Sequence, residues 1–178
     1  MTAAAALALA AALCGSARAE VVVQDVRWSL AAGKDGKRGP YVEASRWAQP
    51  PAARIAGRPR AVVTLANLGR GAEPGVLVRC AVSARLFRVG DAKAEGVWSV
   101  PFWTDEKRIP FLRGAQVKRV VVDDPTLGAY LQKMFRAGFW VDALRIQVMV
   151  DPRAGEGLER HIMERDLAVD ARPPASAP

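Results

Sequence analysis

The chain has 178 residues, of which 51% are hydrophobic and 25% are charged. This balance is typical of a folded protein and excludes an intrinsically disordered one, and the length suits one ordinary domain better than two. The formal net charge of +8 favours acidic partners, such as anionic lipid head groups, acidic glycans or nucleic acid. The alternative is that the abundant arginine reflects a GC-rich genome.

The N-terminal segment 1–19 is predicted to be a cleaved secretory signal peptide. Ala3 to Leu13 contains only Ala and Leu, a run too short to span a bilayer but typical of a signal-peptide core. Ala17-Arg18-Ala19 then supplies the small residues of a cleavage site. No basic residue follows Met1, which leaves open a start codon further upstream. Lipidation of Cys14 is a weaker alternative, because Leu13 stands where a small residue is expected.

Export predicts a periplasmic or secreted location, and no transmembrane span is expected in the mature chain. Cleavage would leave Cys80 as the only cysteine, so no internal disulfide is expected even in an oxidising compartment. We expect residues 20–170 to form a single domain and residues 171–178, which are rich in Pro and Ala, to form a disordered tail.

Alternation of apolar and polar residues predicts short strands along the mature chain. The predicted strands are 20–30, 61–68, 76–89, 97–103, 115–122, 139–150 and 161–169. Because Pro101 lacks an amide hydrogen, strand 97–103 is expected to lie at an edge or to be interrupted. About seven short strands separated by Gly, Pro, Asn and Asp predict an all-β fold, an antiparallel β-sandwich.

One inserted helix is predicted near 125–137. Asp124 is a candidate cap and Pro125 suits the first helical position. Gly138 supplies a stop. The apolar residues that recur at helical spacing are Leu127, Tyr130, Leu131, Met134 and Phe135.

Residues 31–60 are expected to form a long irregular connection, because they contain several glycines and prolines. A brief strand is expected within it, at Tyr41 to Ala44. Connections of this length are usually functional or mobile.

Several segments resemble a bacterial immunoglobulin-like domain, of the cell-adhesion-related (CARDB) type or the fibronectin type III type. Val63 to Gly69 is similar to a strand followed by an Asn-x-Gly turn, and Gly75 to Leu86 is similar to the next long strand. Phe111 to Val117 and Leu144 to Pro152 are similar to later segments of that family. The resemblance implies an immunoglobulin-like fold and a role in binding, adhesion or scaffolding, with no catalytic residues to carry over. The helix near 125–137 departs from that pattern.

The residues that could carry out catalysis do not form a specific catalytic motif. Cys80 and His161, the only histidine, are conceivable as a thiol–imidazole pair, but Cys80 falls on the apolar side of its strand, where cysteine is usually an inert small hydrophobe. Carboxylates near turns are conceivable as a hydrolytic pair or as solvated loop residues. They are Asp105, Glu106, Asp123, Asp124, Glu156, Glu159, Glu164 and Asp166. No cofactor and no metal site is expected.

The tryptophans divide into two groups. Trp28, Trp98 and Trp140 lie in predicted strands and are expected in the core. Trp47 and Trp103 lie in the connection and at a strand end, where packing onto the sandwich is favoured over contact with a partner.

The favoured function is that of an exported, non-catalytic binding or assembly domain of the cell envelope. The expected partner is a protein or an anionic envelope component, and no nucleic acid is expected. The alternatives are a small secreted hydrolase using a carboxylate pair and an accessory subunit of an envelope complex. The candidate binding residues lie in the connection 31–60, where cationic and aromatic side chains concentrate. They are Lys34, Lys37, Arg38, Tyr41, Arg46, Trp47, Arg54, Arg58 and Arg60.

Overall fold

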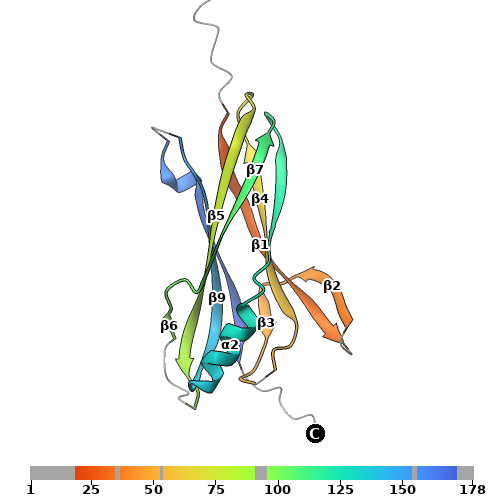
Figure 1. The fold of residues 1–178 in the computed structure, drawn as a ribbon, viewed down its shortest axis with the longest axis vertical. Helices are drawn as coiled ribbons and strands as arrows, with labels where there is room; N and C mark the ends of the chain where they lie inside the picture. Colours follow the sequence, from red (N-terminus) through yellow and green to blue (C-terminus); the bar gives the residue numbers. More distant parts are fainter. Residues whose placement is uncertain (1–18, 35–36, 53, 91–95, 154–155, 172–178) are drawn as a thin grey trace, which may run out of the picture.

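The chain forms two packed β-sheets and one helix, which confirms the predicted all-β sandwich with an inserted helix (Figure 1). The computed structural model describes residues 19–34, 37–52, 54–90, 96–153 and 156–171. All of the predicted signal peptide except Ala19, together with Cys14 and nearly all of the predicted tail, lies outside these residues. No helix in the described part of the chain is long and apolar enough to cross a membrane.

The first sheet, sheet A, has the strand order β2-β1-β4-β8, and all its neighbouring strands are antiparallel. Its strands are β1 (Val21–Lys34), β2 (Lys37–Glu43), β4 (Arg58–Asn67) and β8 (Val117–Val122). The end of β1 and all of β2 form a hairpin that projects from the body of the molecule, at the lower right of Figure 1.

The second sheet, sheet B, has the order β3-β10-β9-β5-β6, and β7 also pairs with β5. Its strands are β3 (Arg46–Ala48), β5 (Glu73–Arg88), β6 (Val97–Trp98), β7 (Trp103–Leu112), β9 (Phe139–Val150) and β10 (Ile162–Asp170). The short strand β3 pairs with β10 in parallel, whereas the other pairs are antiparallel.

The core lies between the sheets and follows the predicted alternation. Cys80 is buried and free, as predicted, in the middle of β5. Trp28 and Trp140 are buried as well, which confirms their predicted places. Trp98 differs, because it is only half-buried and its ring lies 4.2 Å from the guanidinium carbon of Arg145.

Helix α2 (Leu127–Arg136) packs against β9 and confirms the predicted helix. Leu127 and Leu131 are buried, and Phe135 meets the ring of Trp140 edge-on. The predicted helix start is wrong by two residues, because Asp124 Oδ1 accepts hydrogen bonds of 2.7 Å from the N–H and the hydroxyl of Thr126. This local turn holds Asp124 and Pro125 ahead of the helix and makes Thr126 the cap residue.

The long irregular connection predicted at 31–60 is wrong, because most of it is strand. β1 continues to Lys34, and β2, β3 and the start of β4 occupy much of the rest. Pro40 belongs to the edge strand β2, where a missing amide hydrogen is tolerated, so the count of glycines and prolines was a poor guide.

The segment 97–103 is interrupted as predicted, since β6 ends at Trp98 and β7 begins at Trp103. The rest of β7 has no counterpart in the prediction. It contains a run of four charged residues, Asp105 to Arg108, followed by Pro110, so the apolar alternation that marks a strand is weak there.

Candidate functional site

An apolar groove of about 540 Å³ lies between the projecting hairpin β1–β2 and the short strand β3. It belongs to the segment in which the sequence placed the binding site. The groove is lined by Leu30, Ala31, Pro40, Val42, Glu43, Ala44, Trp47, Ala48, Ala56 and Gly57.

One wall of the groove is the inner face of the hairpin. Leu30 and Val42 are directly paired across β1 and β2, on the same face of β1 as the buried Val26 and Trp28. Val26 and Trp28 are covered by sheet B, whereas the hairpin extends past that cover. Val42 is therefore 64% exposed, although it stands where a core residue would be.

The opposite wall is the turn that follows β3. The buried Trp47 donates from Nε1 to the carbonyl oxygen of Ala56 at 2.8 Å. The buried Gln49 accepts the N–H of Ala56 at Oε1 at 2.5 Å, and its own carbonyl accepts Nε1 of Trp140 at 2.9 Å. Because these bonds are satisfied inside the protein, this wall is formed before any ligand arrives.

Gly57 closes this turn against the hairpin. Its φ of +76° lies in the left-handed region that favours glycine. A Cβ at this position would lie 3.0 Å from the carbonyl oxygen of Ala31. The close approach of Gly57 to β1 therefore brings the two walls together at the base of the groove.

Two strand edges border the groove, since β2 ends sheet A and β3 ends sheet B. Only Ala44 and Ser45 separate the two strands. The N–H of Ala44 donates to the carbonyl of Trp28, so by alternation the backbone groups of Tyr41 and Glu43 point away from β1.

The same alternation applies to β3. The carbonyl of Ser45 accepts the N–H of Ala168, and the N–H of Gln49 donates to the carbonyl of Asp170. The backbone groups of Arg46 and Ala48 therefore point to the free side of β3. Among the described residues no strand pairs with either edge, so these donors and acceptors are available to an added strand.

The structure separates the site residues that the sequence predicted. Trp47 is 3% exposed and forms part of the groove wall, in line with the packing favoured for it. Tyr41 and Arg60 stack on each other, with 3.6 Å between the guanidinium carbon and the ring centroid, and Arg58 pairs with Asp123 at 3.0 Å.

Arg46 and Arg54 are exposed, whereas the side chains of Lys34, Lys37 and Arg38 lie outside what the structure describes. Sequence reasoning missed the apolar lining, above all Leu30, Pro40 and Val42. The alternation that reveals it continues past the predicted end of the first strand, but the glycines of the hairpin hide it.

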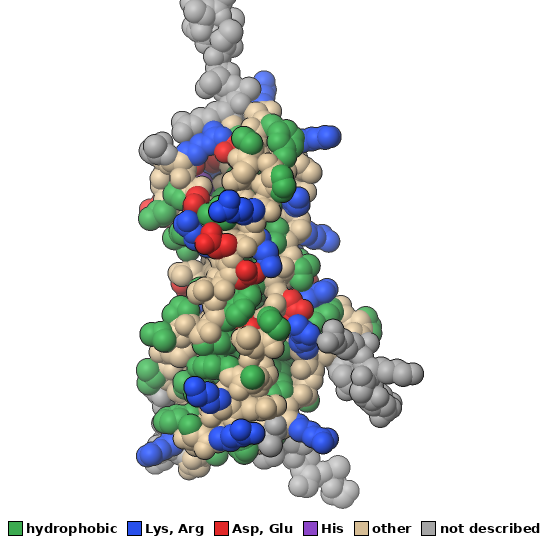
Figure 2. Space-filling view, viewed as in Figure 1, with side chains coloured by type: hydrophobic (Ala, Val, Ile, Leu, Met, Phe, Trp, Pro, Cys, Tyr) green, Lys and Arg blue, Asp and Glu red, His purple; other side chains and the backbone are tan. Residues whose placement is uncertain are grey.

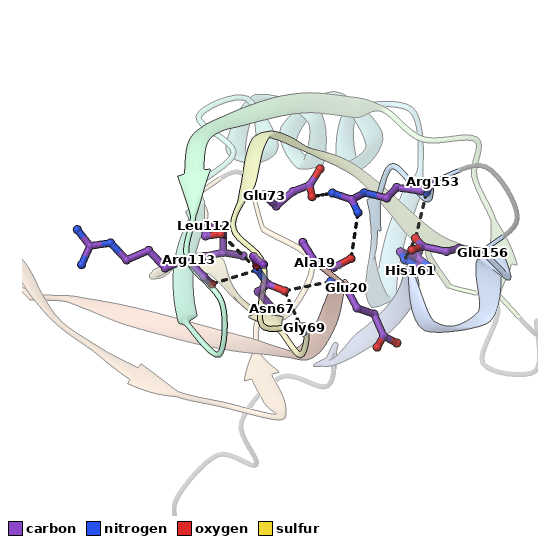
Figure 3. Close-up of polar contacts among 11 residues, drawn as sticks. Ala19, Glu20, Asn67, Gly69, Glu73, Leu112, Arg113, Arg153, Glu156 and His161 are labelled. Atoms are coloured by element: carbon purple, nitrogen blue, oxygen red, sulfur yellow. Dashed lines mark hydrogen bonds and ion pairs between the residues drawn. The ribbon is translucent and has the colours of Figure 1, made fainter. Parts of the chain in front are cut away.

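A separate polar cluster lies at the opposite end of the sandwich, around the buried Asn67 (Figure 3). Asn67 Oδ1 accepts the N–H of Glu20 at 3.0 Å and that of Gly69 at 3.1 Å. Nδ2 donates to the carbonyls of Gly71, Leu112 and Arg113 at 2.8, 3.3 and 3.1 Å. One side chain thus fixes the start of β1, the turn after β4 and the end of β7.

His161 is buried beside this cluster, next to the short 3-10 helix η1 (Leu158–Arg160). Its Nδ1 lies 2.8 Å from the carbonyl oxygen of Gly157, and its Nε2 lies 3.2 Å from a carboxylate oxygen of Glu156. Arg153 pairs with Glu73 and donates to the carbonyl of Ala19 at 3.2 Å (Figure 3). These contacts hold the β9–β10 connection against the starts of β1 and β5.

The thiol of Cys80 is poorly suited to nucleophilic chemistry. Burial raises its pKa to about 12, and the negative charge of Asp105 acts in the same direction. Since the thiolate is the nucleophile, a raised pKa makes the thiol less reactive. The ring of His161 is engaged by Gly157 and Glu156 instead.

Most of the candidate carboxylates are paired with cations. Asp105 pairs with Lys107, Glu106 with Arg79 and Asp123 with Arg58. Glu164 and Asp166 both pair with Arg145. Within the described ranges, no cluster of three or more His, Cys, Asp or Glu side chains is placed to hold a metal ion.

No protein-family model matches the sequence. No curated protein matches it either. Among solved structures, the chain is similar to the Beta-D-glucoside glucohydrolase from Trichoderma reesei, with 14% identity and a TM-score of 0.31. The match covers 85% of this chain but only 18% of that one, so the chain spans a small part of the enzyme's length. A likeness this distant carries no argument about activity.

Proposed function

We propose that this protein is an exported binding or assembly domain of the cell envelope, and that it takes an extended segment of a protein partner in the groove between β2 and β3. The observation that carries the proposal is an apolar groove bordered by two unpaired strand edges. An extended segment uses both features at once, since its backbone pairs with an edge while alternate side chains enter the groove.

Two features of the groove favour binding energetically. Val42 is 64% exposed on the face that elsewhere forms the core, and burying a side chain of this type contributes about 1.5–3 kcal/mol. The Trp47–Ala56 and Gln49–Ala56 hydrogen bonds hold the opposite wall in place, so little ordering of that wall opposes binding.

The cellular setting of the proposal comes from the sequence. The apolar run at 3–13 and the site at Ala17-Arg18-Ala19 support export, so the partner belongs to the periplasm, the envelope or the exterior. We also propose that the sandwich is of the immunoglobulin-like type that the Asn67-Leu68-Gly69 turn resembles, since that type serves binding and adhesion.

The test uses Val42→Asp and a short capped peptide in which valine alternates with threonine. NMR titration of the full chain is expected to shift the backbone amides of Tyr41, Glu43 and Ala48 and the indole N–H of Trp47. Val42→Asp is expected to weaken this binding at least tenfold, because it places a charge in the apolar wall.

The matched control is Val97→Asp, because Val97 is 73% exposed on β6, away from the groove. This variant is expected to bind the peptide as the unchanged protein does. Shifts confined to other surfaces, or equal binding by Val42→Asp and the unchanged protein, would contradict the proposal.

A further inference from the structure

The groove is apolar inside but has unpaired positive charge at its border. Arg46 is exposed and shares a face of β3 with Ala48, which lines the groove. Arg54 is exposed and precedes the lining residue Ala56 by two positions. In the described part of the chain, no carboxylate lies within ion-pair distance of either guanidinium.

Negative charge at the groove is already neutralised. Glu43 is the only acidic residue that lines it among the described residues, and its carboxylate pairs with Arg27 at 3.0 Å. On the face seen in Figure 2, acidic side chains lie in the upper and middle parts, whereas the charged side chains in the lower third are those of Lys and Arg. A ligand in the groove therefore meets the positive charge of Arg46 and Arg54 at the groove border.

We infer that the segment bound in the groove alternates apolar with acidic residues, so that its apolar side chains face Val42 and Trp47 and its carboxylates face Arg46 and Arg54. The inference rests on the proposed function, because it names the chemistry of the segment that the groove takes. An extended segment has this geometry by nature, since successive side chains point to opposite sides.

The expected size of the effect follows from the exposure of the two arginines. Ion pairs between exposed groups are weak and screened by salt, so each pair is expected to tighten binding by about two- to fivefold. The acidic preference is therefore expected to be modest at equilibrium, to shrink as salt is added and to act partly through faster association.

The test compares three capped peptides of equal length, in which valine alternates with glutamate, threonine or lysine. Each is titrated into the full chain at low and at high salt, with the groove amides as the readout. The expected order of affinity is glutamate, then threonine, then lysine, and the differences are expected to narrow at high salt. The double variant Arg46→Gln with Arg54→Gln is expected to remove most of the glutamate advantage and to leave threonine-peptide binding unchanged.

The control is Arg108→Gln with Arg113→Gln, two exposed arginines on or just after β7, near the end of the sandwich that holds Asn67. This variant is expected to keep the full preference for glutamate. Equal affinities for the three peptides, or tighter binding of the lysine peptide, would overturn the acidic assignment while leaving the groove as a binding site. If no peptide shifts the groove amides, the proposed function itself fails.

Discussion

The guanidinium carbon of Arg60 lies 3.6 Å from the centroid of the Tyr41 ring. The two residues come from β4 and β2, which flank β1 on opposite sides, so the contact ties the projecting hairpin to the body of sheet A. Arg60 also approaches the hydroxyl of Ser29 on β1 at 3.3 Å. We therefore infer that this contact stabilises the hairpin wall of the groove.

Replacing Tyr41 by Leu is expected to lower the free energy of unfolding by about 0.5–1 kcal/mol, the range of a cation–π contact at a partly exposed site. Tyr41→Phe keeps the aromatic face and is expected to lose little. Urea denaturation of Tyr41→Leu, Arg60→Gln and the double variant checks the contact, since the two losses are expected to be less than additive. Full additivity would show that the two side chains do not interact.

Replacing Trp47 by Ala is expected to lower the free energy of unfolding by about 3–5 kcal/mol, because the residue is 3% exposed and leaves a large cavity. Trp47→Phe keeps most of the packing but removes the hydrogen bond to Ala56, for an expected loss of at least about 1 kcal/mol. Guanidinium denaturation measures both. A small loss for Trp47→Ala would mean that the indole is not part of the core.

The thiol of Cys80 is expected to make stability fall at alkaline pH. Its pKa is about 12 in the folded protein and 9.0 ordinarily, so between these values the unfolded chain releases a proton that the folded chain keeps. Stability from this group is therefore full below pH 9.0 and declines by about 1.4 kcal/mol per pH unit above it. The slope is read from the difference in unfolding free energy between the unchanged protein and Cys80→Ala. Lys and Tyr titrate in both proteins, so their contribution cancels in this difference. Parallel pH profiles for the two proteins would rule out the raised pKa.

Replacing Asn67 by Ala is expected to destabilise the protein by at least about 2 kcal/mol, because the variant leaves buried backbone groups of three segments without partners. Asn67→Asp keeps the acceptor for the N–H of Gly69 but loses the Nδ2 donors, and an intermediate loss is expected. Amide hydrogen exchange supplies a local readout. Protection of the Gly69 amide is expected to fall in Asn67→Ala, and unchanged protection would argue against the role assigned to this side chain.

Alternation along single strands was enough to predict the sandwich. The alternate apolar residues of Val76 to Ala84 and of Leu144 to Val150 are all buried between the sheets. The helix near 125–137 could also be predicted from the sequence, because its apolar spacing and Gly138 are local signals. The helix start was misplaced because the bond between Asp124 and Thr126 competes with the capping geometry expected from residue type alone.

The groove was decided by tertiary structure. The sequence drew attention to residues 31–60 through their charge and aromatic content, but Val42 and Leu30 line a groove only because the hairpin extends past the cover of sheet B. Likewise the indole N–H groups of Trp47 and Trp28 donate to the carbonyls of Ala56 and Arg165. These partners depend on how distant parts of the chain return to each tryptophan. Local periodicity fixes which side of a strand is apolar, whereas only the packing of distant segments decides whether that side is covered or left open to a partner.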